Sequence, residues 1–178
     1  MGKYIIQTDR LGLRTWTTKD LEPMSQFNAD ERVMEYFPST KSVSDTKAFI
    51  ESQQRAQAVE GYCFFAAEVL ATQSLIGFIG ILKFKFDVDF APGVEVGWRL
   101  GHAHWGKGYA TEGARAVLKF AFEEKNIPEI WSFTTLTNTR SENVMKKIGM
   151  SRTGTFDHPL VDEGHPLKPH VLYHLTRP

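Results

Sequence analysis

The stretch Gly93–Ala116, GVEVGWRLGHAHWGKGYATEGARA, joins a strand pattern, a glycine-rich turn and the start of a helix. Its first part alternates apolar residues with Glu95, Gly97 and Arg99, and this period of two predicts a strand with one apolar face. From Ala110 onward, apolar residues recur at the helical period instead. A strand, a glycine turn and a helix start in this order present unpaired backbone N–H groups and the positive end of a helix dipole, which favours binding of a phosphate group.

Two common phosphate-binding loops fit this stretch poorly. Gly101, Gly106 and Lys107 have the spacing of a P-loop, but Gly108 stands where a Ser or Thr hydroxyl would bind magnesium. The dinucleotide-binding fingerprint matches at Gly106 and Gly108, but Thr111 stands at its third glycine and the order of flanking elements is wrong. The remaining interpretations are a pyrophosphate site without nucleotide hydrolysis, or a turn that only joins strand to helix.

Length and composition are those of an ordinary globular protein. The 178 residues are enough for one domain, 1–178, with its own core. Lys plus Arg and Asp plus Glu are both 21, so net charge gives no sign of a nucleic-acid or membrane partner. The N-terminus does not resemble a signal peptide and no run approaches the ~18 apolar residues of a membrane helix. We expect a cytoplasmic protein in which Cys63, within an apolar run, is a buried and inert thiol.

The remaining pattern predicts alternating strands and helices without repeats. Strands are expected within 4–16, 61–70, 75–88, 93–100, 129–136, 150–156 and 170–177, with residues 71–74 as a hairpin turn. Helices are expected from Thr18 or Asp20 to about 27, and over 30–37, 44–60 and 110 to about 126. A short helix is expected after residue 137, with Thr139 and Glu142 as a capping box and Gly149 as its end.

Three histidines in a proline-rich loop raise the question of a metal. His158, His165 and His170 are separated by seven and five residues, which is not a helical zinc pattern, and no cysteine accompanies them. We therefore expect no metal and interpret these side chains as loop polar groups or as neighbours of an acceptor amine.

Three separated motifs together resemble the acetyl-CoA site of the GNAT N-acetyltransferase superfamily: EVGWRL, WGKGYATEGARA and NTRSENVMKKIGM. TDRLGLRTW near the N-terminus and the form WGKGYATE resemble its RimJ/RimL-type branch. The resemblance covers nearly the whole chain. It implies an α+β fold with a mostly antiparallel twisted sheet of about six to seven strands, flanked by helices and splayed in the middle to admit acetyl-CoA.

The resemblance also implies an activity, namely transfer of an acetyl group to a primary amine. The acceptor is either a protein N-terminal α-amine, as in ribosomal-protein acetylation, or a small amine, and the enzyme is expected to act as a monomer or homodimer. Segments 28–40 and 156–170 are expected to wall the acceptor side, with contacts from Tyr36, Phe37, His158 and His165.

Roles in cofactor binding follow from the matched positions. The family's glycine motif matches this chain from Lys107 to Ala110, although Trp105 replaces its Gln or Arg. The strand before the motif, Trp98 to Leu100, is expected to pair through its backbone with the pantetheine amides. Asn138 and Ser141 match the start of the family's next helix. The expected cofactor-binding residues are Trp98, Leu100, Gly106, Lys107, Gly108, Tyr109, Ala110, Thr111, Asn138 and Ser141.

Acetyl transfer needs a base for the amine, a donor for the oxyanion and an acid for the leaving thiolate. Glu95 is the candidate base, directly or through water, unless it is simply a solvent-facing residue. Met145 stands where the superfamily often has a tyrosine acid, so Ser141 becomes the candidate acid, with Tyr109 or a water as rivals. The alternative is a non-catalytic module that binds acetyl-CoA or a protein, and the joint presence of Glu95, Asn138 and Ser141 speaks against it.

Overall fold

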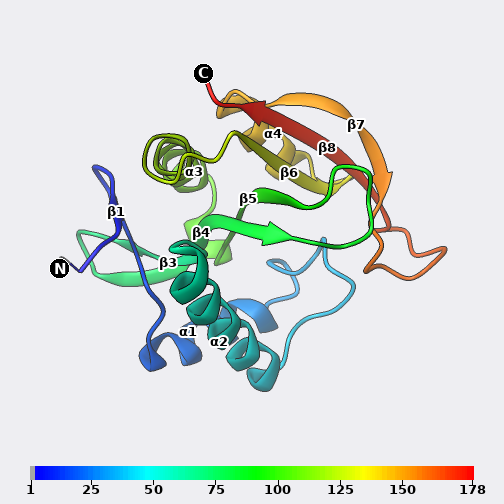
Figure 1. The fold of residues 1–178 in the computed structure, drawn as a ribbon. Coiled ribbons are helices and arrows are strands. Elements are labelled where there is room, and N and C mark those ends of the chain that lie inside the picture. Colours follow the sequence, from blue (N-terminus) through cyan, green and yellow to red (C-terminus); the bar gives the residue numbers. More distant parts are fainter. Residues whose placement is uncertain (1–2) are drawn as a thin grey trace.

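Eight strands form one sheet in the computed structural model, which describes residues 3–178 (Figure 1). The strands are β1 Ile6–Gln7, β2 Leu11–Arg14, β3 Phe64–Val69, β4 Ser74–Phe84, β5 Gly93–Leu100, β6 Glu129–Thr135, β7 Ser151–Asp157 and β8 Pro169–Thr176. The α-helices are α1 Leu21–Ala29, α2 Val43–Glu60, α3 Tyr109–Lys119 and α4 Thr139–Lys147. Short 3-10 turns lie at η1 Thr18–Asp20 and η2 His102–His104, and a π-helical turn, η3, covers Phe120–Glu124.

The strand order is β1-β2-β3-β4-β5-β6-β8-β7. Every neighbouring pair is antiparallel except β5 and β6, because α3 carries the chain over the sheet between them and returns it in the same direction. Helices α3 and α4 cover one face of the sheet, and α1 and α2 cover the other (Figure 1). The mixed α+β architecture predicted from the sequence is therefore confirmed.

The sheet has one strand more than the six to seven expected. Residues 4–16 were expected to hold a single strand, but they form the hairpin of β1 and β2. The reversal is closed by hydrogen bonds between Thr8 and Leu11, in which the Leu11 amide donates to Thr8 Oγ1 at 2.9 Å and the Thr8 amide donates to the Leu11 carbonyl at 2.9 Å. A Thr hydroxyl that binds the backbone in this way favours a turn over an extended chain.

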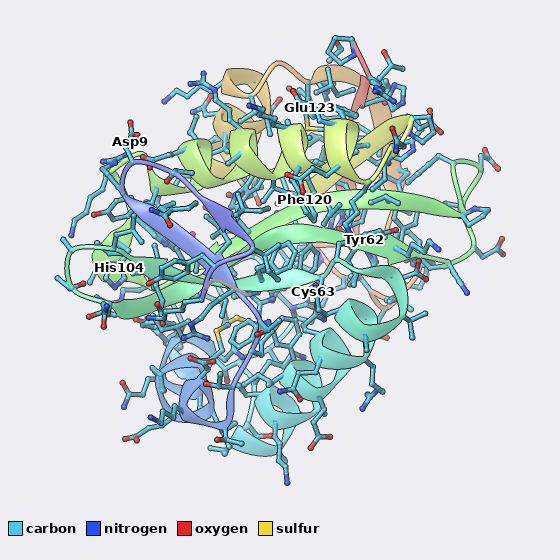
Figure 2. The ribbon with its side chains drawn as sticks, turned by 60° about the vertical axis from the view of Figure 1, so that its left-hand side comes forward. Asp9, Tyr62, Cys63, His104, Phe120 and Glu123 are labelled. Carbon is cyan, nitrogen blue, oxygen red and sulfur yellow. The ribbon has the colours of Figure 1, made fainter. Side chains whose placement is uncertain are left out.

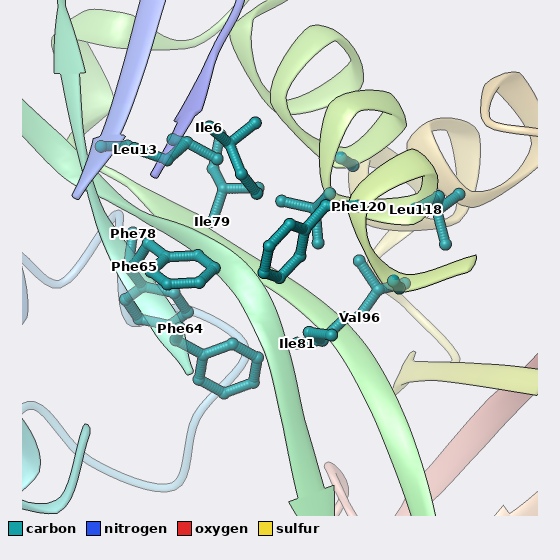
Figure 3. Close-up of a cluster of buried hydrophobic side chains, with 14 of the residues drawn as sticks. Ile6, Leu13, Phe64, Phe65, Phe78, Ile79, Ile81, Val96, Leu118 and Phe120 are labelled. Atoms are coloured by element: carbon teal, nitrogen blue, oxygen red, sulfur yellow. The ribbon is translucent and has the colours of Figure 1, made fainter. Parts of the chain in front are cut away.

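The two faces of β5 have the environments that the alternating pattern predicts. Val96 packs with Ile79 and Ile81 under α3, and the Phe120 ring points toward them from η3, directly after that helix (Figure 3). Val96, Ile79 and Ile81 are almost completely buried. The opposite face of β5 carries Glu95, Gly97 and Arg99 and looks toward α1 and α2. Burying one face in this way fixes the register, since a shift by one residue would place Glu95 in the core.

Residues 30–37 do not form the helix that was expected there. Helix α1 ends at Ala29, and Asp30 has extended dihedral angles. The Asp30 carboxylate accepts hydrogen bonds from the Arg32 amide at 3.0 Å and the Arg32 guanidinium, so it ties the backbone into a turn that competes with helix formation. Val33 and Met34 are buried below this turn. The apolar residues that suggested a helix, Val33 and Met34, instead anchor a loop to the core.

Two further expectations about helix ends were wrong in detail. The first residue of α4 is capped by Asn138 rather than by Thr139, since the Asn138 Oδ1 accepts from the Ser141 amide at 3.2 Å. Glu142 does not close a capping box but accepts a hydrogen bond from the Tyr173 hydroxyl at 2.8 Å. The helix expected to continue to about residue 126 is α-helical only to Lys119 and then widens into η3.

Other expectations about local structure are confirmed. Gly149 follows α4 with a φ of 90°, the left-handed conformation that ends a helix. Cys63 is fully buried directly before β3, beside Tyr62 (Figure 2). Burial raises the pKa of the Cys63 thiol to about 12, which keeps it protonated and unreactive. Within residues 3–178, no helix combines the length and apolarity needed to cross a membrane.

Two glycines in neighbouring strands, Gly80 and Gly97, lie where a side chain would collide with residues 63–65. Gly80 of β4 is the register partner of both Phe64 of β3 and Gly97 of β5. A Cβ on Gly97 would lie 2.9 Å from the Phe64 ring, which therefore lies across the space that a side chain at Gly97 would occupy. A Cβ on Gly80 would lie 2.1 Å from the Cys63 carbonyl oxygen. The close approach of β3 and β4 thus depends on the absence of a side chain at Gly80.

Gly80→Ala is expected to lower the free energy of unfolding by about 2 kcal/mol or more, because backbone atoms of β3 must move to accept the methyl group. For a chain of this size the loss corresponds to a melting temperature lower by roughly 5 °C. Gly154→Ala in β7 is the control, since no heavy atom lies within 4 Å of the position of its Cβ. Equal thermal unfolding curves for the two variants would contradict the described spacing of β3 and β4.

Candidate functional site

The parallel strands β5 and β6 are aligned at a single residue pair, Glu95 with Trp131. Beyond it the strands diverge, and the Ser132 hydroxyl, rather than a backbone amide, donates to the Val96 carbonyl at 3.0 Å. The last residues of β5 therefore have no strand on their β6 side among residues 3–178. This divergence is the splay expected from the sequence. It leaves an edge of β5 backbone to which an extended amide-containing ligand can pair.

Trp105 closes the turn after β5. Its indole Nε1 donates to the Leu100 carbonyl at 2.7 Å, and its ring lies 5.0 Å from the Arg140 guanidinium. The Leu100 carbonyl is therefore engaged within the protein, which leaves Gly97 to Arg99 as the part of the edge that is free of this contact. The same hydrogen bond explains how a tryptophan can occupy a position where the family motif has Gln or Arg, since its role here is to hold the turn.

The glycine loop turns directly into α3. Gly106 and Gly108 have φ angles of 72° and 79°, which a residue with a side chain adopts only with strain. Gly108 is the N-cap of α3 and offers no capping side chain, so the first N–H groups of the helix, beginning at Tyr109, have no side-chain partner there. Both glycines are exposed. The turn therefore directs backbone donors and the positive end of the α3 dipole toward solvent, as an anion site requires.

Arg10, which lies 97 positions before Lys107 in the sequence, holds this loop and was not among the predicted site residues. From the β1–β2 turn, its Nη1 donates to the Lys107 carbonyl at 2.9 Å, and its Nε donates to Glu112 Oε2 at 2.6 Å. Its guanidinium also lies 4.8 Å from the centre of the Tyr109 ring. Although burial opposes it, hydrogen bonds from Thr8 and Arg10 hold the pKa of Glu112 below its usual value. The available signal was the motif TDRLGLRTW, which had suggested a relationship but no contact.

Glu95 lies on the α1 and α2 side of β5 at the point where the strands part. Its carboxylate has no ion-pair partner among residues 3–178. Desolvation by the surrounding protein raises the pKa of Glu95 to about 8. The simple alternative of a fully solvated surface glutamate does not fit this environment. A carboxyl group with a pKa near neutrality is suited to exchange a proton with an amine.

Asn138 and Ser141 are joined at the start of α4. The Asn138 Oδ1 caps the Ser141 amide, and its Nδ2 donates to Thr134 Oγ1 at 2.9 Å and to Ser141 Oγ at 3.1 Å. The Asn138 carboxamide is thus used to position its neighbours. The Ser141 hydroxyl accepts this bond and keeps its own proton for donation. Met145, one turn later, is buried in the core.

Phe37 is brought onto the face of the sheet that carries Glu95. Its ring lies 4.1 Å from the guanidinium of Arg99, which is four residues after Glu95 on β5. Phe37 is nevertheless 38% exposed, so it lies at the surface of this region. Tyr36 is half-buried beside it, and desolvation raises the pKa of its hydroxyl. The loop that was expected to be a helix therefore supplies Phe37 as a wall of the region.

His158 and His165 have different surroundings. His158 belongs to an aromatic cluster in which its ring lies 4.9 Å from Phe86, 5.7 Å from Phe133 and 4.9 Å from His170. Desolvation lowers the pKa of His158 to about 4, so this ring is neutral at physiological pH. The Nδ1 of His165 instead accepts from the Leu167 amide at 3.1 Å, within the loop itself.

The aromatic cluster borders the Glu95 region, because Phe133 lies two residues after Trp131, the register partner of Glu95. His170, which was interpreted from the sequence as a loop polar group or a neighbour of an acceptor amine, is also a member of this cluster. Its Nδ1 lies 2.9 Å from the Lys168 carbonyl. In the described part of the chain, no group of three or more His, Cys, Asp or Glu side chains is placed to hold a metal ion.

Comparisons with known proteins agree with this geometry. Residues 10–151 match the family model described as an acetyltransferase (GNAT) domain. The uncharacterized N-acetyltransferase YnaD of Bacillus subtilis is 33% identical over 152 residues, which cover 85% of this chain and 85% of that protein. The crystal structure of a GNAT-family acetyltransferase from Bacillus anthracis has a TM-score of 0.80 and 29% identity, covering 97% of this chain and 98% of that one.

A second solved structure has the same fold at much lower sequence identity. The spermidine N-acetyltransferase of Vibrio cholerae, solved in complex with CoA and spermine, has a TM-score of 0.74 at 16% identity, covering 96% of this chain and 97% of that one. At this identity the likeness concerns the fold alone. Together with the family match over most of the chain, the splayed sheet and the glycine loop lead to one conclusion: this protein belongs to the GNAT family of acetyltransferases and is an acetyltransferase enzyme.

Proposed function

We propose that this protein transfers the acetyl group of acetyl-CoA to a primary amine between β5 and β6. The observation that carries the proposal is the arrangement of three features along one continuous segment. Desolvated Glu95 lies where the strands part, an unpaired backbone edge follows, and the glycine loop and α3 begin beyond it. These three features match, in that order, a reacting amine, the thioester-bearing arm of the cofactor and its pyrophosphate.

The chain's residues fit acetyl-CoA without a further group. Backbone donors from Gly106 to Thr111 would hold the pyrophosphate, and Lys107 adds a positive charge beside it. The β5 edge at Trp98 would pair with the pantetheine amides. When bound, acetyl-CoA supplies an activated acyl group whose transfer to an amine needs no metal. Arg10 supports this site by holding the Lys107 carbonyl and the first turn of α3.

Glu95 is assigned as the general base that accepts the amine proton, directly or through water. Its raised pKa brings its basicity closer to that of an amine than an ordinary carboxylate would be. A backbone N–H of β5 is the candidate donor to the oxyanion.

Ser141 is assigned as the donor to the leaving thiolate. Its hydroxyl is oriented by Asn138 through an accepted hydrogen bond at 3.1 Å, so the hydroxyl proton is the part left for a ligand. Tyr109 is less suited to this task, because its ring is stacked against Arg10 at the glycine loop. Asn138 is then a positioning residue for Ser141.

The acceptor is a primary amine, either a protein N-terminus or a small molecule. The motifs TDRLGLRTW and WGKGYATE support the RimJ/RimL-type branch and hence a protein N-terminal amine. The structural likeness to a spermidine acetyltransferase keeps small amines in consideration. Phe37 and the aromatic cluster around His158 would form the two sides of the acceptor region.

A thiol-release assay tests the proposed activity. The protein is incubated with acetyl-CoA and a panel of N-terminal peptides and small amines, and CoA is detected with a thiol reagent. Cys63 is fully buried, so the folded protein should contribute little background. We expect amine-dependent CoA release. Tight acetyl-CoA binding without release on a broad panel would instead support the non-catalytic module.

Gly108→Val is expected to weaken acetyl-CoA binding at least tenfold, because a branched side chain strains a φ of 79° and crowds the anion site. Calorimetric titration with acetyl-CoA measures the effect. Gly164→Val is the matched control, since Gly164 has a φ of 76° but lies in the loop between β7 and β8, which is assigned to the acceptor side and not to acetyl-CoA. Equal affinities in the two variants would remove the glycine loop from the cofactor site.

Glu95→Gln is expected to lower kcat by about 100-fold while acetyl-CoA affinity stays nearly unchanged. Because only ionised Glu95 accepts a proton, the rate ratio of the parent to this variant should rise with pH through about 8. Taking the ratio cancels the ionisation of the amine itself, which is common to both proteins. Glu123→Gln, an exposed change on η3, is the control. A ratio that stays near one at every pH would return Glu95 to a structural role.

Ser141→Ala is expected to lower kcat roughly ten- to a hundredfold, the effect of losing one hydrogen bond to a charged acceptor. Acetyl-CoA affinity should change little, and Ser151→Ala on the exposed part of β7 should be neutral in both measurements. If affinity falls while kcat is maintained, Ser141 is a binding contact. An acyl donor that depends less on leaving-group protonation, such as an acetyl thioester of a more acidic thiol, should reduce the defect.

A further inference from the structure

Two arginines are shielded from water in this fold, Arg14 as a buried residue and Arg99 as a half-buried one, and their charges are compensated differently. Arg14 on β2 forms ion pairs with both Asp20 and Glu68, and its Nε donates to Glu68 at 2.7 Å. Although burial opposes it, these two carboxylates raise the pKa of Arg14 above its ordinary value. This arginine is fully compensated within the protein, as a buried cation normally must be.

Arg99 on β5 has no such compensation. Among residues 3–178 no carboxylate forms an ion pair with it, and its Nε is buried without a hydrogen-bond partner. Desolvation lowers the pKa of the Arg99 guanidinium to about 10, which still leaves it charged at neutral pH. The protein therefore maintains a desolvated positive charge without supplying an anion to balance it.

The Arg99 guanidinium is also held in one position. Its Nη1 donates to the Asn28 Oδ1 at 2.9 Å, and Asn28 in turn donates to Thr46 Oγ1 at 3.0 Å. Asn28 and Thr46 are both buried, so this chain of hydrogen bonds is fixed by the packing of α1 on α2. The rings of Phe37 and Phe78 lie 4.1 and 5.4 Å from the guanidinium. These neighbours orient the cation but none of them carries a negative charge.

Arg99 and Glu95 lie on the same face of one strand, four residues apart, which corresponds to about 13 Å along β5. Gly97 lies between them and contributes no side chain, and the Phe64 ring fills the space above it. The two charged groups are thus kept apart rather than paired. Arg99 is half-buried and Phe37 above it is partly exposed, so the position is reachable from the side assigned to the acceptor.

We propose that Arg99 binds an anionic group of the acceptor, so that the preferred substrates are amines that carry a carboxylate several bonds from the amino nitrogen. The proposal rests on the proposed function, since it places the amine beside Glu95 and the carboxylate beside Arg99. A guanidinium matches a carboxylate geometrically through its planar set of donors. The same positive charge disfavours acceptors with a second ammonium group.

The parent protein alone provides the first test. Linear amino acids with about three to eight carbons between the amine and the carboxylate, chosen to span the Glu95–Arg99 distance, are compared with their primary amides. Short peptides with an acidic residue near the N-terminus are compared with their amide counterparts in the same way. We expect a kcat/KM for the acids roughly 10- to 100-fold above that for the amides, in at least one of the two series. The series that shows it identifies a small or a peptide acceptor.

The variant Arg99→Gln then assigns the preference to this residue. We expect it to abolish the advantage of the acids while kcat/KM for the amides and acetyl-CoA affinity change little. Arg99→Lys, which keeps the charge but loses the planar fork, should retain part of the preference. Arg115→Gln, at an exposed arginine on α3, should leave it intact. Thermal unfolding of each variant verifies that it is folded.

The outcomes separate this inference from the proposed function. No CoA release with any amine would reject the activity itself. Amine-dependent release at equal rates for acids and amides by the parent protein would reject only the role of Arg99. A loss of acetyl-CoA affinity in Arg99→Gln, or an equal loss with acids and amides, would also overturn it, because Arg99 would then serve the cofactor or the packing of α1.

Discussion

The divergence of β5 from β6 is the constraint on which the rest of the structure depends. Two parallel strands that separate leave backbone groups without their usual partners, and such groups must be satisfied if they are shielded from water. The Ser132 hydroxyl donates a hydrogen bond to the Val96 carbonyl, and the Trp105 indole donates one to the Leu100 carbonyl. Between these two contacts the edge of β5 stays available. Because only residues 101–108 connect the end of β5 to the start of α3, the glycine loop must lie close to this divergence.

Three arginines show how the fold distributes charge around this opening. Arg14 is neutralised by Asp20 and Glu68 and serves only the junction of β2, β3 and η1. Arg10 connects the first hairpin to the glycine loop, 97 positions later in the sequence. Arg99 is held in place by a hydrogen bond to Asn28, but no carboxylate among residues 3–178 pairs with it. The charge that is not compensated internally is the one that faces the proposed acceptor.

The sequence predicted most elements wherever local pattern and tertiary packing agree. The alternation in β5 and the amphipathic pattern of α3 are read correctly, because burial of one face is what selects both patterns. Residues 30–37 have a helical pattern but form a turn, since the Asp30 carboxylate captures the Arg32 amide. Similarly, Asn138 rather than Thr139 caps α4, because its side-chain oxygen accepts the hydrogen bond of the Ser141 amide. Side-chain hydrogen bonds of this kind decide boundaries that periodicity does not.

The candidate site also has one part that the sequence predicts and another part that only the structure shows. The sequence by itself determined the family, the glycine loop and the choice of Glu95 and Ser141 as candidates, because these depend on residue types at fixed short spacings along one segment. Only the tertiary structure decided that Arg10 holds the loop across 97 positions of sequence, that Phe37 reaches the strand of Glu95, and that Arg99 has no counterion. The desolvation of a side chain and the compensation of its charge depend on every residue that the fold brings next to it. Many of these residues are far away in the sequence, and a single sequence shows no pattern that links them.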